Sequence, residues 1–491
     1  MDAWTGDALI ETRIVVLFFR SLGMAAAVAL VSFSIAIPLA TVFQSRGDAC
    51  HRRLSGLRWL LVSIILIPPY IHALAWMDFL GRLSAFARTF GRNWTVQGDL
   101  ISTWVWVMAL LPCAVGVSIL VLESVQPDLF QAARLVRDDL TAFLRIILPL
   151  AAPSLLVGAG FVMLICLLDY SVASLFGVSV YALEIFADYS ATGNVGRALA
   201  LSLPLLLAAL FWILVSIKYL RPGQQTPALY PVPEGQVLRW PSAWSWIQNL
   251  ALLLVFFQAL VPVLVLLVRT GSWQAFLSAY QGSRAELWYS LRIVALTLLG
   301  VLPLGVLLSA GLHGSGRMAR WLWAGILIPF LTPAPLVGIL LVQLRNLVPS
   351  LGSSGAILPV MAGCIRFAPL AAVVLTVQRS RINPAYIEAA RILEGSPLRR
   401  SWSVVLPLLK PGILVAAGLA AALSLGELGA TLMVTPPGRS TLAVKIYNYL
   451  HYGASDQVAS LCLLVTFLAA AVIGLCFWMV RAAGTRSGGP A

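Results

Sequence analysis

The segment QPDLFQAARLVRDDLTAFLRIILPLAAP, residues 126–153, returns as INPAYIEAARILEGSPLRRSWSVVLPLLKP, residues 382–411, about 257 residues later in the chain. Each copy is polar and helix-forming, and each lies between long apolar segments. Self-similarity over such a distance is typical of a duplicated protein. We therefore expect two equivalent halves that present the same loop to the same kind of partner.

The composition is that of an integral membrane protein. Of the 491 residues, 60% are hydrophobic and 11% are charged, which lies outside the range of soluble proteins. The net charge of +14 is scattered between apolar stretches and forms no basic stripe with interleaved aromatic residues, so we expect no nucleic-acid partner. The six cysteines show no CxxC or metal-ligand spacing, and we expect free thiols and no metal site.

Apolar segments of about 20 residues can cross a bilayer, and they predict an all-α polytopic membrane protein with about 11 spans, or alternatively 12. The expected spans are residues 20–43, 58–80, 101–122, 151–178 and 197–217 in the first half, and 249–268, 288–312, 319–345, 356–378, 411–434 and 458–481 in the second. The domains follow as a first repeat (1–220, loop 126–149), a cytoplasmic linker (221–248) and a second repeat (249–491, loop 383–407).

Positive charge sets the orientation, because Lys and Arg concentrate on the cytoplasmic side of membrane proteins. With both repeated loops inside, that side collects about twice as many of these residues as the other side. An odd number of spans then places the N-terminus outside and the C-terminus in the cytoplasm. Asp2, Asp7 and Glu11 precede the first apolar run, so this run lacks the basic start of a signal peptide and should remain a membrane helix.

The repetition extends beyond the two loops. RWLLVSIILIPP (58–69) parallels RWLWAGILIPFL (320–331), LLDYSVASLF (167–176) parallels LGELGATLMV (425–434), and YALEIFA (181–187) parallels LAVKIYN (442–448). Since both loops face the same compartment, the halves are parallel repeats about an axis along the membrane normal. A pathway on that axis would be lined by equivalent helices from both halves.

Local signals predict that each repeated loop is a helical hairpin. Asn383 and Pro384 favour a helix start, Gly395 can end that helix, and a second start follows at Ser396 and Pro397. The first copy has Pro127, followed by Asp138 and Asp139 at the second start. Small alanines beside charged residues suit close docking of a partner. The alternative is an amphipathic helix that rests on the bilayer surface.

Residues 388–407, EAARILEGSPLRRSWSVVLP, resemble the EAA loop of type I ABC importer permeases, whose pattern is EAA, then a glycine, then Leu-Pro about twenty residues on. In that family the loop is the coupling helix that sits in a cleft of a cytoplasmic ATPase. The resemblance implies two fused permease domains in a bacterial inner membrane, similar to the iron(III) and thiamine importers that carry both halves in one polypeptide.

The resemblance assigns ATPase coupling to matching residues of both loops. They are Gln131, Ala132, Ala133 and Arg137 in the first, and Glu388, Ala389, Ala390 and Gly395 in the second. The first loop departs from the family pattern because Gln131 replaces the glutamate, Arg137 stands near the glycine position and the loop is one residue shorter. The second has Glu394 at the usual glycine position. We expect both loops to dock, with unequal strength.

The chain should not be its own ATPase. It contains no GxxxxGK[ST] loop, and none of its three lysines, Lys218, Lys410 and Lys445, follows such a glycine pattern. No cofactor is expected in this chain. Mg-ATP would be bound by two copies of a separate nucleotide-binding subunit, and a periplasmic or lipoprotein substrate-binding protein would dock on the outer loops, as the resemblance implies. Alternating access driven by the ATPase is the expected mechanism.

Two acids are the best candidates for the translocation pathway. Asp169 and Glu427 occupy equivalent positions of the repeat in apolar segments, where ionisable groups usually face the bundle interior or a water-filled cavity. The alternative for both is a carboxylate that caps a broken helix. Arg366 could contact an anion, although snorkelling or a bond to carbonyl groups is favoured. His72 is interpreted as an interior histidine with its hydrogen bonds satisfied, rather than as a metal ligand.

The substrate is expected to be iron(III), with thiamine, polyamine and phosphonate compounds as alternatives that the resemblance leaves open. A different class, the ion-coupled secondary transporter, also uses repeats and intramembrane carboxylates. Paired cytoplasmic docking helices distinguish the importer from that class. An intramembrane enzyme has no support, because no His, Cys or carboxylate cluster shows catalytic spacing.

Overall fold

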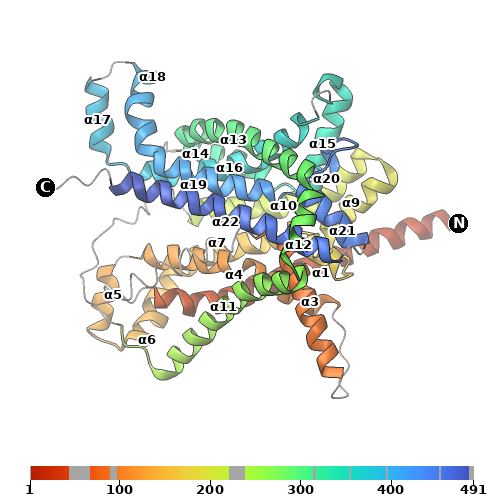
Figure 1. Ribbon diagram of the computed structural model, residues 1–491. Coiled ribbons are helices and arrows are strands. Elements are labelled where there is room, and N and C mark those ends of the chain that lie inside the picture. The colour runs from red at the N-terminus through yellow and green to blue at the C-terminus, as the bar shows by residue number, and fades with distance from the viewer. Residues whose placement is uncertain are drawn as a thin grey trace. The chain divides into compact units, whose positions relative to one another are not determined.

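The computed structural model describes residues 2–43, 67–88, 97–125, 127–219, 238–312, 317–352, 355–393, 396–452 and 455–485. Within these ranges every regular element is a helix, which confirms the predicted all-α class (Figure 1). The first helices are α1 (Asp2–Val42), α3 (Pro69–Arg88), α4 (Asp99–Glu123), α5 (Pro127–Arg134), α6 (Asp139–Ala142), η1 (Phe143–Ile147), α7 (Leu148–Leu168), α8 (Ser171–Leu175), α9 (Tyr181–Thr192), α10 (Val195–Tyr219), α11 (Ser242–Thr270) and α12 (Trp273–Gln281). The later ones are α13 (Arg284–Leu312), α14 (Arg317–Phe330), α15 (Ala334–Leu347), η2 (Pro349–Gly352), α16 (Ile357–Ser380), α17 (Pro384–Leu393), α18 (Pro397–Arg400), η3 (Ser401–Val405), α19 (Leu406–Leu425), α20 (Thr431–Val434), α21 (Leu442–Tyr452) and α22 (Ser455–Thr485).

Nine helices in the described ranges are long and apolar enough to cross a membrane, against about 11 spans predicted. One expected span, residues 319–345, is instead a pair of helices, α14 and α15, bent by 88°. Pro333 lies in this break, and a proline there cannot donate the backbone hydrogen bond that would continue the helix. The start of another expected span, residues 58–66, lies outside the described residues.

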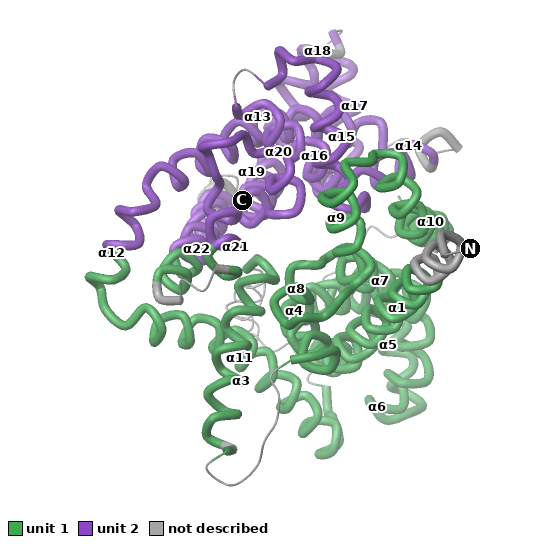
Figure 2. Tube along the Cα trace, turned by 90° about the vertical axis from the view of Figure 1, so that its right-hand side faces the viewer, with its two compact units in different colours: residues 1–220, 227–277, 449–463 green, residues 221–226, 278–448, 464–491 purple. Residues whose placement is uncertain are grey.

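The chain divides into two compact units (Figure 2). Unit 1 comprises residues 1–220, 227–277 and 449–463, and unit 2 comprises residues 221–226, 278–448 and 464–491. Helix α11 packs against α1, α3 and α4 within unit 1. The edge of the compact unit therefore lies beyond residue 249, where the second sequence repeat was expected to begin.

The two units share a packing pattern. Helices α1, α4 and α7 pack on one another in unit 1, and α13, α16 and α19 do so in unit 2. In unit 1 the Ser21 hydroxyl accepts a hydrogen bond from the Tyr181 backbone N–H (2.9 Å), and in unit 2 the Ser290 hydroxyl accepts one from the Leu442 N–H (2.8 Å). These matching bonds tie the first helix of each set to the start of α9 or α21. They also make Ser21 equivalent to Ser290, and Tyr181 equivalent to Leu442, in the two repeats.

Helices α13 and α16 approach closely because glycines stand at the crossing. A Cβ atom on Gly363 would lie 2.7 Å from Cγ2 of Thr297, and one on Gly305 would lie 2.9 Å from Cβ of Ala371. Small residues at such crossings let membrane helices pack with backbones near one another.

Replacing Gly363 with alanine should therefore destabilise unit 2. The added methyl group meets a β-branched side chain that has little rotamer freedom, and overpacking of this kind costs roughly 1–3 kcal/mol. Gly474→Ala on α22 is the matched control, because nothing lies within 4 Å of a Cβ there. We expect the midpoint of thermal unfolding, measured on the detergent-purified protein, to fall for the first variant and to stay level or rise for the second. Equal midpoints would contradict the close-packing argument.

Candidate functional site

Both repeated loops form the predicted helical hairpins. Helix α5 begins at Pro127 and α6 at Asp139, while α17 begins at Pro384 and α18 at Pro397, so all four predicted starts are confirmed. Asp138 caps α6 by accepting the backbone N–H of Thr141 at 3.1 Å. Hydrogen bonds from Thr141 hold the pKa of the Asp138 carboxyl below its ordinary value. In Figure 1 each hairpin lies at the end of its unit remote from α9 or α21.

The second arm of each hairpin is continuous with a membrane span. Helix α6 passes through the π-helical turn η1 into α7, and α18 passes through the π-helical turn η3 into α19. The expected spans at 151–178 and 411–434 therefore begin earlier, because the helices already run from residues 139 and 397. π-helical turns are rare and recur at functional sites. A movement of either hairpin would be passed directly to the helix that crosses the membrane.

The alanine pair of each loop divides between two surfaces. Ala133 and Ala390 are 7% and 5% exposed and face their own hairpins, whereas Ala132 and Ala389 are exposed. Consecutive residues on an α-helix point about 100° apart, so when one alanine of a pair packs into the hairpin, its neighbour can face outward. Among the remaining predicted coupling residues, Glu388 and Arg137 are exposed, Gln131 is partly buried, and Gly395 lies outside the described residues.

An ionic brace, which sequence reasoning missed, holds the first hairpin. Nε of Arg134 donates to Oδ1 of Asp139 at 2.6 Å, and the backbone N–H of Arg239 donates to Oδ2 of the same carboxylate at 2.6 Å. Pro397 occupies the matching position of the second hairpin and offers no carboxylate. The sequence did contain a signal for this ion pair. One acid suffices to cap a helix, so the second of the adjacent acids Asp138 and Asp139 was available for another partner.

Asp169 and Glu427 lie at helix breaks rather than inside continuous spans, which corrects the expectation from sequence. Helix α7 ends at Leu168 and α19 at Leu425. The Asp169 carboxylate accepts hydrogen bonds from Nε1 of Trp106 (2.9 Å) and from the Ser171 hydroxyl (2.8 Å). This is the geometry of the capping alternative.

Glu427 caps the next helix in the same manner and also has a charged partner. Its side chain is 4% exposed and accepts the backbone N–H groups of Ala430 (2.9 Å) and Thr431 (2.8 Å). Nη1 of Arg366 donates to Oε1 of Glu427 at 2.5 Å. The favoured expectation for Arg366, snorkelling or bonding to carbonyl groups, was therefore wrong. The ion pair and the two backbone hydrogen bonds together offset the cost of burying this carboxylate.

His72 is fully buried in α3, which confirms the expected interior position. The expectation of satisfied hydrogen bonds was wrong, because neither ring nitrogen has a hydrogen-bond partner among the described residues. The part of the chain that the structure describes contains no group of three or more His, Cys, Asp or Glu residues that could hold a metal ion.

Residues 301–484, from the middle of α13 into α22, match the family described as the binding-protein-dependent transport system inner membrane component. The relatives include PhnV of Salmonella typhimurium (strain LT2), named for a 2-aminoethylphosphonate transport system permease, with 42% identity over 82 residues that cover 17% of this chain and 31% of the relative. ModB of Escherichia coli (strain K12), a molybdenum transport system permease, is 30% identical over 26% of this chain and 58% of its own. PotI of the same strain, a putrescine transport system permease, is 25% identical over 38% of this chain and 67% of its own.

The chain thus spans about a third of the length of the first relative and little more than half of the second. The matched region contains the second hairpin, its span and the Arg366–Glu427 pair. The similarity to this family thus covers the part of the chain that contains one of the two hairpins.

Proposed function

We propose that this chain is the permease subunit of a binding-protein-dependent ABC importer, with two permease halves in one polypeptide. One observation carries the proposal: a helical hairpin stands at the same place in both units, exposes one alanine, and continues through a π-helical turn into a span. An ion-coupled secondary transporter has no need of such a pair. The family match over residues 301–484 supports the same assignment for the second half.

The hairpins would couple ATP hydrolysis to transport through rigid rods. The rod from Asp139–Leu168 has 30 residues, or about 45 Å at 1.5 Å per residue, and the second rod is built alike. Each rod begins at a hairpin that faces the ATPase and ends at a helix break capped by Asp169 or Glu427. Movement of the hairpin would thereby be transmitted along the helix to the break at its far end. Alternating access requires such transmission from the ATPase to the membrane-spanning part of the chain.

The proposal includes partners and a location. Two copies of a cytoplasmic ATPase would bind the hairpins, and these subunits would bind and hydrolyse Mg-ATP. A periplasmic or lipoprotein binding protein would deliver the substrate from outside. The chain would lie in a bacterial inner membrane, with the hairpins in the cytoplasm. The names of PhnV, ModB and PotI do not mention iron(III), the first choice from sequence, whereas the phosphonate and polyamine alternatives each have a named relative.

Purification of the tagged full-length chain from membranes of its own host tests the assignment. We expect an ATP-hydrolysing subunit with a GxxxxGK[ST] loop to co-purify, identified by mass spectrometry. Host cells with and without the chain are then compared for uptake of labelled 2-aminoethylphosphonate, molybdate, putrescine, thiamine and iron(III) citrate. Uptake that needs an ion gradient and persists without any ATPase partner would replace the importer with the secondary transporter.

A further inference from the structure

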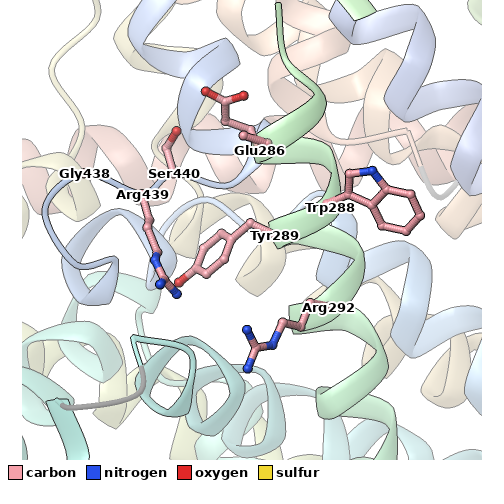
Figure 3. Close-up of a pocket in the computed structure, with 8 residues that line it drawn as sticks. Glu286, Trp288, Tyr289, Arg292, Gly438, Arg439 and Ser440 are labelled. Atoms are coloured by element: carbon pink, nitrogen blue, oxygen red, sulfur yellow. The ribbon is translucent and has the colours of Figure 1, made fainter. Parts of the chain in front are cut away.

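Unit 2 contains a cavity of about 550 Å³ between the start of α13 and the turn before α21 (Figure 3). The residues that line it are Ala285, Glu286, Trp288, Tyr289 and Arg292 from α13, and Gly438, Arg439 and Ser440 from the turn. Figure 3 shows the guanidinium groups of Arg292 and Arg439 turned toward the hydroxyl end of the Tyr289 ring. A volume of this size holds a small molecule.

The cavity is cationic. Neither Arg292 nor Arg439 has an ion-pair partner among the residues that the structure describes. Among the described residues of the lining, Glu286 is the one acid, and it is neutralised by Nζ of Lys445 at 2.9 Å. The same ammonium group donates to the carbonyl of Gly282 at 2.8 Å. The guanidinium groups of Arg292 and Arg439 are therefore available to pair with an anionic ligand.

The lining is fixed by contacts of its own. The Tyr289 hydroxyl donates to the carbonyl oxygen of Gly355 at 2.6 Å, and Cζ of Arg439 lies 5.9 Å from the centre of the Tyr289 ring. Gly438 has φ of +79°, a left-handed conformation that favours glycine, and this turn presents Arg439 to the ring. A cation over an aromatic face is stabilised by the ring quadrupole.

The position of the cavity places it at the outer end of unit 2. Gly355, which accepts the Tyr289 hydroxyl, lies just before α16, whereas the second hairpin follows the last residue of that helix. The 24 residues of α16 span about 36 Å, roughly the thickness of a bilayer core. Arg292 also lies within the candidate span Arg284–Leu312, where an ionisable group normally faces a water-filled cavity.

The first unit provides a built-in comparison. Aligned through Ser21 and Ser290, Gly23 stands where unit 2 has Arg292. Aligned through the left-handed glycines Gly177 and Gly438, Val178 stands where unit 2 has Arg439. The two cationic side chains are thus absent from the equivalent framework of unit 1, so the fold of the repeat does not require them.

We propose that this cavity binds a small oxyanion of the phosphonate or phosphate class as the transported substrate reaches the permease from outside. The assignment rests on the proposed importer function. Planar guanidinium forks match the oxygens of tetrahedral anions in distance and charge, and two of them converge here without a competing carboxylate. Glu286 is paired with Lys445 and so leaves both guanidinium groups to the anion.

Direct binding to the full-length chain in lipid nanodiscs tests the site. The probes are methylphosphonate, 2-aminoethylphosphonate, inorganic phosphate and putrescine, followed by isothermal titration calorimetry. We expect at least one of the three anions to bind and putrescine not to bind. Arg292→Gln and Arg439→Gln should each weaken anion binding by about tenfold or more, since each removes a charge-assisted hydrogen bond. Arg284→Gln, an exposed arginine two turns earlier on α13, is the matched control and should bind as the wild type does.

Two results would overturn the oxyanion site. One is anion affinity that is unchanged in the Arg292→Gln/Arg439→Gln double variant. The other is lack of anion binding by the wild-type chain together with loss of uptake in the variants, which would show that the arginines contact the binding protein instead. Co-purification of the ATPase is scored on the same preparations and tests the importer assignment separately, so the oxyanion site can fail while that assignment stands.

Discussion

Uptake should fall by about 30-fold to 1,000-fold when Ala132 and Ala389 are both replaced by tryptophan, the range that corresponds to about 2–4 kcal/mol lost at the centre of a protein interface. Both alanines are exposed, one on each hairpin, and their small size is what would let a partner approach the helix closely. An indole ring there would hold the ATPase away from both hairpins. Uptake by host cells and the amount of co-purified ATPase measure the two consequences together.

The neighbouring alanines supply the control for this experiment. Ala133 and Ala390 are buried against their own hairpins, so tryptophan there should lower the thermal midpoint of the purified protein. The Ala132→Trp/Ala389→Trp variant should keep the wild-type midpoint, because its new side chains point outward. Wild-type uptake in that variant would contradict the coupling role. Comparison of the single variants, and of Glu388→Lys with Gln131→Lys, would show which hairpin contributes more.

The hairpins could be predicted from sequence because their boundaries depend on local signals. A proline in the first turn and a capping side chain before it determine where each short helix begins, as at Pro384 and Asp138. The buried or exposed state of each alanine in a pair depends on how the hairpin folds back on itself, and no local pattern indicates it.

The ends of the spans could not be predicted because composition does not mark them. The apolar character of residues 151–178 continues past Leu168, and the helix ends there since the Asp169 carboxylate bonds to Trp106 and Ser171. The partner of Arg366 lies 61 residues away in sequence. The cavity of unit 2 likewise joins α13 to a turn far along the chain, so Arg292 and Arg439 form no motif that a reading of the sequence could find.

Removal of the Glu427 charge should destabilise the protein more than removal of the Asp169 charge at the equivalent position. Glu427→Gln leaves Arg366 without its partner in an apolar span, and a broken buried ion pair costs about 3–5 kcal/mol. Among the described residues, the donors to Asp169 are uncharged and come from Trp106, Ser171 and the backbone of Val172, so Asp169→Asn should cost about 1–3 kcal/mol. The free energy of unfolding, measured by SDS titration of the purified protein, compares the two variants.

The double variant Arg366→Met/Glu427→Gln separates the structural role of this pair from a role in transport. Replacement of both charges removes the unpaired cation, so we expect the double variant to recover at least half of the stability lost in Glu427→Gln. A loss in Glu427→Gln no greater than that in Asp169→Asn would show that the Arg366–Glu427 pair contributes little to the fold. If stability returns and uptake returns with it, Glu427 acts as a helix cap alone. If stability returns while uptake stays low, the charge itself is needed where the rod of unit 2 ends, and the predicted place of Glu427 in the translocation pathway gains direct support.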